Sequence, residues 1–214
     1  MPKLARTAEV RQNDPEETRA NILEVATREF ADKGLAGARI DEIAEKTSSS
    51  KRMIYYYFGG KEELYRAVLE QAYHRIRSQE ADAHFEALPP AEALRQYVGQ
   101  TFDYHAENPD FVRLVMNENI HHGEHIGHVE GLKERNRSVI ASLKAIVDGG
   151  AAQGVFRGDI DPVELHMTVS ALCFYNVSNR YTFRSNFGVD MGASKAKARR
   201  RDQVADIVLA WVGT

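Results

Sequence analysis

The stretch "IDEIAEKTSSSKRMIYYYF", residues 40–58, decides the fold prediction because it encodes two short helices joined by a tight turn. The first, residues 40–46, places Asp41 and Glu42 in its first turn, where carboxylates interact favourably with the helix dipole. Three serines then form a turn or an N-cap, and residues 50–57 form the second helix. Two short helices around a tight turn, the second of them basic, are typical of a helix-turn-helix.

The second helix carries cations and tyrosines on its exposed side. Ile54 and Phe58 are four residues apart and form the side that faces the core. A lysine, an arginine that can read guanine and stiff tyrosine hydroxyl donors suit a phosphate backbone and a DNA groove. The residues that we predict to contact DNA or to cap this helix beside a phosphate are Ser50, Lys51, Arg52, Tyr55 and Tyr56. The alternative is a helical interaction module whose tyrosines pack on another protein.

The composition of the chain points to an ordinary globular protein. It has 214 residues, 43% of them apolar, which is enough for a substantial core. The net charge of −3 does not by itself indicate nucleic-acid binding. However, the segment from Lys46 to Lys61 contains four cations and no carboxylate, so its local charge is positive. The single cysteine, Cys173, excludes an internal disulfide and favours a reducing compartment. No stretch has the length of a signal peptide or a membrane span, so we expect a soluble, cytoplasmic protein without membrane contacts.

Helical spacing of apolar residues continues along the chain, without strand alternation or an internal repeat. Asp14 and Pro15 begin the first helix, after a mobile arm formed by residues 1–13. Further helices are predicted for residues 61–88, 91–108, 109–123, 125–153, 161–183 and 194–212. The prediction is therefore an all-α protein of about nine helices. A three-helix head occupies residues 14–61, and a larger helical body occupies residues 62–214.

Residues 18–70 resemble the N-terminal domain of TetR-family transcriptional regulators, which are bacterial proteins. The residues in register with the family are Ile22, Ala26, Phe30, Gly34, Gly37, Ile43, Ala44, Lys51, Ile54, Tyr55, Tyr56, Phe58, Lys61 and Leu64. The resemblance implies that residues 50–57 are the recognition helix, that Tyr57 also faces DNA, and that Lys61 meets a phosphate.

Four residues depart from the family pattern. Ser48 stands where the family usually has a turn glycine, and Arg52 where a small residue is frequent. Tyr57 occupies a position that is commonly histidine. Arg39 replaces a Ser or Thr cap, so the second helix has a weaker cap but gains a possible phosphate contact. We expect these four differences to affect which operator sequence the protein recognises, and not whether it binds DNA.

The resemblance implies a ligand-responsive repressor. Such a protein binds a near-palindromic double-stranded DNA operator as a homodimer and is released by a small-molecule effector. Beyond residue 70 the resemblance is one of architecture, with stretches similar to regulators of small-molecule catabolism. In the family the last two helices form the dimer interface. No cofactor and no catalytic residue is expected.

The stretch "VSALCFYNVSNRYTF", residues 169–183, is apolar but includes polar residues that need partners. These partners are either an effector in a mostly apolar pocket or groups across a dimer interface, and both alternatives stay open. The candidates for effector binding are Phe102, Met116, Asn117, Ser170, Phe174 and Asn176. The candidates for the dimer interface are Asn179, Arg180, Val208 and Trp211.

A histidine cluster supports a different hypothesis, a metal-dependent enzyme. His121, His125 and His128 have a spacing that can place metal ligands on one helical face. However, Gly123 and Gly127 break the helix that this geometry needs, and no cysteine or carboxylate set completes a site. We therefore predict no metal and no enzyme, and a solvated connection in this segment.

Overall fold

The computed structural model describes residues 14–81 and 85–214, so the predicted arm of residues 1–13 lies outside the described residues. The all-α prediction is confirmed, since the described part contains ten α-helices, two short 3₁₀ helices and no β-strand. The chain forms two compact units that divide between Tyr65 and Arg66. Helix α4, Lys61–Ala81, belongs to both of them.

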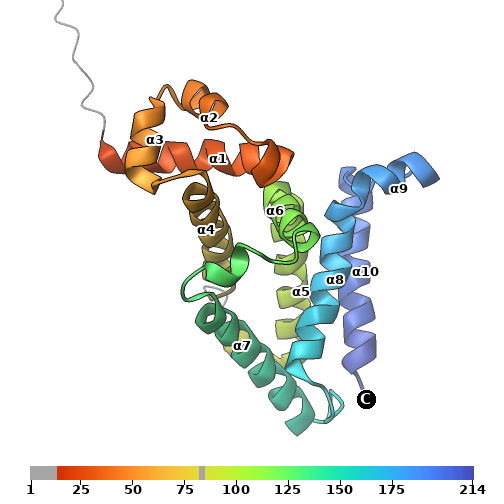
Figure 1. Ribbon diagram of the computed structural model, residues 1–214. Coiled ribbons are helices and arrows are strands. Elements are labelled where there is room, and N and C mark those ends of the chain that lie inside the picture. Colours follow the sequence, from red (N-terminus) through yellow and green to blue (C-terminus); the bar gives the residue numbers. More distant parts are fainter. Residues whose placement is uncertain (1–13, 82–84) are drawn as a thin grey trace, which may run out of the picture. The chain divides into compact units, whose positions relative to one another are not determined.

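The first unit, which we call the head, contains three helices and the start of α4 (Figure 1). Its helices are α1 (Pro15–Gly37), α2 (Ile40–Thr47) and α3 (Lys51–Phe58). Asp14 caps α1 by accepting a hydrogen bond from the Glu16 backbone N–H at 2.9 Å, as its position before Pro15 predicts. The core contains Ile22, Ala26, Phe30, Ile43, Ile54, Phe58, Leu64 and Tyr65. Most of these residues are the apolar positions on which the helix-turn-helix prediction rests. Their burial against one another stabilises the head.

The second unit is a helical bundle. Its helices are α5 (Pro90–Glu107), α6 (Pro109–Ile120), α7 (Leu132–Ala152), α8 (Pro162–Ser178), α9 (Arg180–Phe187) and α10 (Ser194–Val212), with 3₁₀ turns at Phe85–Ala87 and Ile126–His128. Helix α8 packs against both α5 and α10, and α10 packs along α5 (Figure 1). The core that these helices share with α7 includes Leu94, Val98, Phe102, Leu143, Leu165, Val169, Val204 and Val208.

The number of helices differs slightly from the prediction because the predicted helix after Asp161 is divided in two. Asp161 caps α8 as expected, accepting from the backbone N–H groups of Val163 and Glu164. At Asn179 the backbone leaves the helical region, with ψ near 4°. The Ser178 hydroxyl donates to the Asn179 side chain at 2.7 Å, and Thr182 donates to the Asn179 carbonyl. Such local side-chain bonds compete with a continuous helix.

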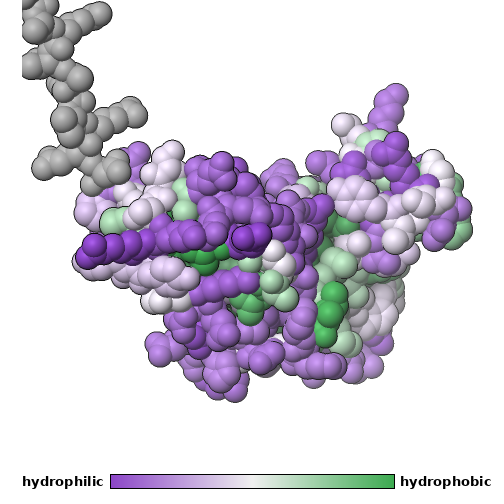
Figure 2. Space-filling model, turned by 45° about the horizontal axis from the view of Figure 1, so that its top comes forward, coloured by the Kyte–Doolittle hydropathy of each residue, from purple (hydrophilic) through white to green (hydrophobic). Residues whose placement is uncertain are grey.

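Figure 2 shows one face of the molecule, on which hydrophilic residues dominate and apolar side chains occur in small groups. In the described part of the chain, no helix is both long and apolar enough to cross a bilayer.

Candidate DNA-binding surface and ligand cavities

The turn between α2 and α3 forms without the usual glycine. Ser48 adopts the left-handed conformation, with φ 53° and ψ 26°, and its N–H bonds back to the end of α2. A non-glycine residue costs about 1 kcal/mol in this region. Ser50 then caps α3, as predicted, by accepting from the Met53 backbone N–H at 3.2 Å. The turn therefore starts α3 at Lys51.

Helix α3 has the two faces that the sequence predicts. Ile54 and Phe58 are buried against the head, with 1% and 9% of their surface exposed. The side chains on the opposite face are exposed at Lys51, Arg52, Tyr55 and Tyr56 and half-buried at Tyr57. Tyr56, at 79%, is the most exposed tyrosine of this helix. Cations and hydroxyls thus form a polar surface on one short helix, which we call the α3 face and define by these five residues.

The α3 face is tied to α2 through Asp41. The Lys51 ammonium lies 2.6 Å from the Asp41 carboxylate, and Arg39 lies 3.9 Å from it. The hydrogen bond from Lys51 lowers the pKa of Asp41 below its usual value. Arg39 makes no side-chain cap to α2, as its identity predicts. Lys51 is therefore held at the start of α3 by a carboxylate on the neighbouring helix.

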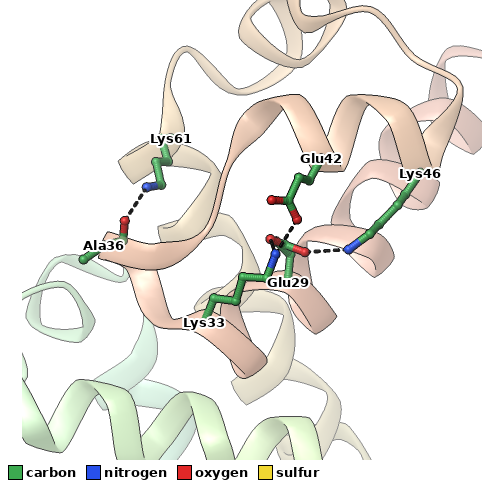
Figure 3. Close-up of polar contacts among 6 residues, drawn as sticks. All are labelled: Glu29, Lys33, Ala36, Glu42, Lys46 and Lys61. Atoms are coloured by element: carbon green, nitrogen blue, oxygen red, sulfur yellow. Dashed lines mark hydrogen bonds and ion pairs between the residues drawn. The ribbon is translucent and has the colours of Figure 1, made fainter.

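Lys61 lies at the start of α4 and reaches the end of α1. Its ammonium is 3.4 Å from the Ala36 carbonyl oxygen (Figure 3). The side chain is partly exposed, so its charge is accessible to solvent. Its contact with a DNA phosphate stays a prediction.

A buried carboxylate that the sequence analysis missed joins α1 to α2. Glu29 has only 1% of its side chain exposed and pairs with Lys33 and Lys46, both at 2.7 Å (Figure 3). Lys33 also pairs with Glu42 on α2. Burial alone would raise the pKa of Glu29, but the hydrogen bonds from the two lysines outweigh it and lower the pKa below 4.5. The four-residue spacing of Glu29 and Lys33 predicts an ion pair along one helix, whereas nothing in the sequence predicts that the Glu29 carboxylate is buried.

Glu29→Gln is expected to weaken the head by about 1–3 kcal/mol at neutral pH, the usual effect of removing a buried hydrogen-bonded charge. Because the folded-state pKa of Glu29 is lowered, its contribution is present above the unfolded-state pKa and is lost as the pH falls through the folded-state pKa. The variant and the unmodified protein should therefore converge in acid. Hydrogen exchange of the α1 and α2 amides at several pH values measures this.

The control for this experiment is Glu24→Gln, because Glu24 forms an exposed ion pair with Arg28 on the same helix. Exposed pairs contribute about 0–1 kcal/mol. Equal effects of the two substitutions would show that burial of Glu29 contributes nothing.

In the body, a cavity of about 160 Å³ lies between α4, α5, α6 and α8, and we call it the α4 cavity. It is lined by Tyr73, Ile76, Arg77, Thr101, His105, Phe111, Val115, His166, Ser170 and Phe174. Two predicted effector residues, Ser170 and Phe174, are therefore brought together here. The two histidines were not predicted as lining residues, because no pattern in the sequence distinguishes them.

Both histidines of the α4 cavity are uncharged at neutral pH. Burial, with the nearby Arg77 guanidinium, lowers the pKa of His105 and of His166 to about 4. His166 Nδ1 lies 2.9 Å from the Tyr97 hydroxyl. The His105 ring stacks on Phe111, with 5.8 Å between centroids, and its buried Nδ1 has no hydrogen-bond partner in the described structure. This cavity therefore offers aromatic walls, neutral polar groups and one cation, Arg77.

A second cavity, of about 250 Å³, lies between α6, the end of α8, α9 and the start of α10. We call it the α9 cavity. It is lined by Ala106, Pro109, Val112, Arg113, Met116, Asn176, Val177, Ser178, Arg180, Tyr181, Gly192 and Lys197. It brings together two other predicted effector residues, Met116 and Asn176.

Two of the predicted effector residues lie elsewhere. Phe102 is 1% exposed and belongs to the core of the bundle, because the apolar face of α5 packs against α8 and α10. It lines neither of these two cavities, and its role in effector binding stays a prediction. Asn117 also lines neither of them, and its backbone carbonyl faces His121 Nδ1 at 2.8 Å.

The predicted interface residues also have different environments. Val208 has no exposed surface and packs in the core of one chain, where it presents no surface to a second chain. Arg180 pairs with Asp190 at 3.0 Å, and Asn179 forms the junction of α8 and α9. Trp211 is 37% exposed, with the Arg157 guanidinium over its ring.

The histidine segment folds around the carboxylate of Glu118. Glu118 is 3% exposed and accepts from the backbone N–H groups of His125 and Ile126 at 3.1 and 2.8 Å. Positive φ angles at His122 and Gly123 turn the chain after α6, and Gly131, also at positive φ, directly precedes the predicted long helix, which begins only at Leu132. Among the described residues, no three His, Cys, Asp or Glu side chains are grouped to hold a metal ion.

Comparison with known proteins agrees with this architecture. The family model described as "Bacterial regulatory proteins, tetR family" matches residues 22–68, and "Tetracyclin repressor-like, C-terminal domain" matches residues 90–208. The transcriptional repressor NicS of Pseudomonas putida is 35% identical over 200 residues, which cover 94% of either chain. The repressor SCO4008 of Streptomyces coelicolor is 32% identical, over 77% of this chain and 80% of its own.

Solved structures show the same fold. The putative transcriptional regulator SCO4942 from Streptomyces coelicolor superposes with a TM-score of 0.69 and 26% identity, covering 91% of this chain and 98% of its own. The ketosteroid regulator KstR2 of Mycobacterium tuberculosis, at 19% identity and a TM-score of 0.67, covers 99% of this chain and 100% of its own and shares the fold. With a helix-turn-helix head, a helical body and matches along nearly its whole length, this chain belongs to the TetR family of DNA-binding transcriptional regulators.

Proposed function

We propose that this regulator is a repressor that binds a near-palindromic operator as a homodimer in the cytoplasm and is released by a small-molecule effector. The observation that carries the proposal is the α3 face, where Lys51, Arg52, Tyr55 and Tyr56 are exposed on a helix anchored by buried Ile54. In a helix-turn-helix dimer, two such helices enter successive major grooves about 34–36 Å apart. Arg39 and Lys61 add phosphate contacts beside them.

The α4 cavity is the effector site in this proposal. Tyr73, Ile76 and Arg77 line it from α4, the helix whose first residues belong to the DNA-binding head. A ligand that contacts α4 therefore touches an element that continues into the head. The effector changes operator affinity only to the extent that it binds the two states of the dimer with different affinities. Ser170 and Phe174 contribute to this site from α8.

The proposed dimer interface combines exposed apolar residues of α8 and α10, two helices that lie side by side (Figure 1). Along α8 these are Val163, Met167 and Tyr175, at helical spacing and with 57%, 64% and 44% of their surface exposed. On α10 they are Ile207 and Trp211. Helix α8 is apolar on both sides, which is typical of a helix buried on two faces.

Operator binding is the test of this function. Selection of duplexes from a random library by the purified protein should give a near-palindromic sequence with two half-sites one helical turn apart. Its affinity should fall steeply as salt rises, since phosphate contacts release counterions. Equal, weak binding of all duplexes at low salt would contradict a sequence-specific repressor.

Met167→Glu is expected to weaken self-association at least tenfold, about 1.4 kcal/mol, because a carboxylate would be buried in an apolar interface without a partner. Sedimentation equilibrium measures the dissociation constant. Ile120→Glu is the matched control, since Ile120 is 67% exposed on α6, a helix that is not part of the proposed interface. If both variants dimerise like the unmodified protein, the interface lies elsewhere.

A further inference from the structure

The α9 cavity differs from the α4 cavity in its charge. Three cationic side chains, those of Arg113, Arg180 and Lys197, line it, and its described lining includes no Asp or Glu. Asp190 binds Arg180 with both carboxylate oxygens, at 3.0 and 3.4 Å, and also accepts from the Gly192 N–H. This carboxylate therefore offsets one of the three charges and fixes the Arg180 guanidinium against Gly192.

The same cavity holds a polar group that the protein leaves unsatisfied. Asn176 is 4% exposed and lies on α8, and its buried Oδ1 has no hydrogen-bond partner in the described structure. A buried acceptor without a donor is costly and rare in folded proteins. Asn176 also lines the cavity, so a bound molecule with an O–H or N–H group can supply the missing donor once the side-chain amide turns toward it.

The remaining walls are apolar and set the size of the occupant. Pro109, Val112 and Met116 of α6 and Val177 of α8 line the cavity. A cavity of about 150 Å³ accommodates benzene. The volume of about 250 Å³ therefore leaves room for one ring with a substituent at either end.

We propose that the α9 cavity is a second ligand site, separate from the effector site, for a one-ring organic carboxylate that carries a hydrogen-bond donor. The carboxylate binds among Arg113, Arg180 and Lys197, and the donor bonds to Asn176 Oδ1. The ring lies between Val112, Met116 and Val177. The α4 cavity, with neutral histidines and one cation, favours a less charged molecule. Because Arg113, Arg180 and Lys197 belong to α6, α9 and α10, a bound carboxylate contacts all three helices. It therefore stabilises the break between α8 and α9 at Asn179.

The direct test is calorimetric titration of the full-length, DNA-free protein with 4-hydroxybenzoate, benzoate and 4-hydroxybenzamide. The first has both required groups, the second lacks the donor and the third lacks the charge. We expect 4-hydroxybenzoate to bind at least tenfold more tightly than either of the others. Equal affinity for the amide, or no saturable binding of the acid at millimolar concentration, would overturn the proposal.

Variants locate the site. Lys197→Gln should weaken binding of 4-hydroxybenzoate at least tenfold, whereas Arg199→Gln, which removes an exposed cation from the same helix outside the cavity, should change it less than twofold. Ser170→Val, in the α4 cavity, should leave binding unchanged. Equal effects of Lys197→Gln and Arg199→Gln would indicate non-specific charge attraction and reject the site.

Asn176→Leu separates a ligand contact from a structural role. The substitution removes the unsatisfied acceptor, so the free protein should unfold at the same or a higher temperature while binding of 4-hydroxybenzoate is lost. A lower unfolding temperature would show that Asn176 supports the fold instead. Because these titrations contain no DNA, their failure would leave the proposed operator binding unaffected.

Discussion

Gly150→Ala is expected to lower the stability of the helical body by about 3 kcal/mol, whereas Gly149→Ala, one residue earlier, should raise it by about 0.5–1 kcal/mol. Both glycines lie in the last turns of α7. A Cβ at position 150 would come within 2.5 Å of the Phe156 Cγ and would overlap the ring. A Cβ at position 149 would meet Pro90 Cγ at 3.8 Å, an ordinary contact.

The Phe156 ring cannot move aside, which makes the clash costly. Phe156 is 3% exposed, and its backbone N–H donates to the Gly150 carbonyl at 3.2 Å. The following residue, Arg157, donates to the Val212 carbonyl at 2.8 Å. The ring is thus fixed by the ends of α7 and α10, so an overpacked site must strain one of them.

Thermal unfolding of the two variants measures the difference. In a domain of this size, about 1 kcal/mol corresponds to about 2–4 °C, so Gly150→Ala should unfold about 6–12 °C lower. Gly149→Ala should unfold slightly higher, because alanine has the better helix propensity. Similar shifts for both substitutions would mean that the close approach of Phe156 is unimportant.

Lys51→Ala and Arg52→Ala are expected to weaken DNA binding in two different ways. Losing the Lys51 charge should reduce affinity for every duplex about tenfold and lower the salt slope by about 1, as for a phosphate contact. Arg52→Ala should cost about 1–3 kcal/mol on the operator and relax the preference at one base pair. Lys51 must also exchange its bond to Asp41 for the phosphate, which moderates its effect.

Fluorescence anisotropy on the operator, on single-base variants of it and on a random duplex, at several salt concentrations, distinguishes the two roles. Arg28→Ala is the control, because Arg28 is an exposed cation on α1 paired with Glu24. An unchanged base preference in Arg52→Ala would contradict the base-reading role. A salt slope that Lys51→Ala leaves unchanged would contradict the phosphate contact.

The sequence by itself determined the helical class, the helix-turn-helix and the two faces of α3. These features depend on residues three or four apart, such as Ile54 and Phe58, and on caps such as Asp14, Ser50 and Asp161. Local spacing fixes which side of a short helix is apolar. The family resemblance carried by residues 18–70 rests on the same local pattern, and the comparisons confirm it.

Only the tertiary structure decided which residues of the body meet. Phe102 and Val208 look like lining or interface residues in the sequence, yet helix packing places both in one core. The packing also separates the predicted effector residues into two cavities and buries Glu29 beneath two lysines. Helix α8 has apolar residues on more than one side, so periodicity cannot say which side faces the core, a cavity or a second chain. That choice depends on contacts between residues far apart in the sequence, and therefore only the folded chain specifies it.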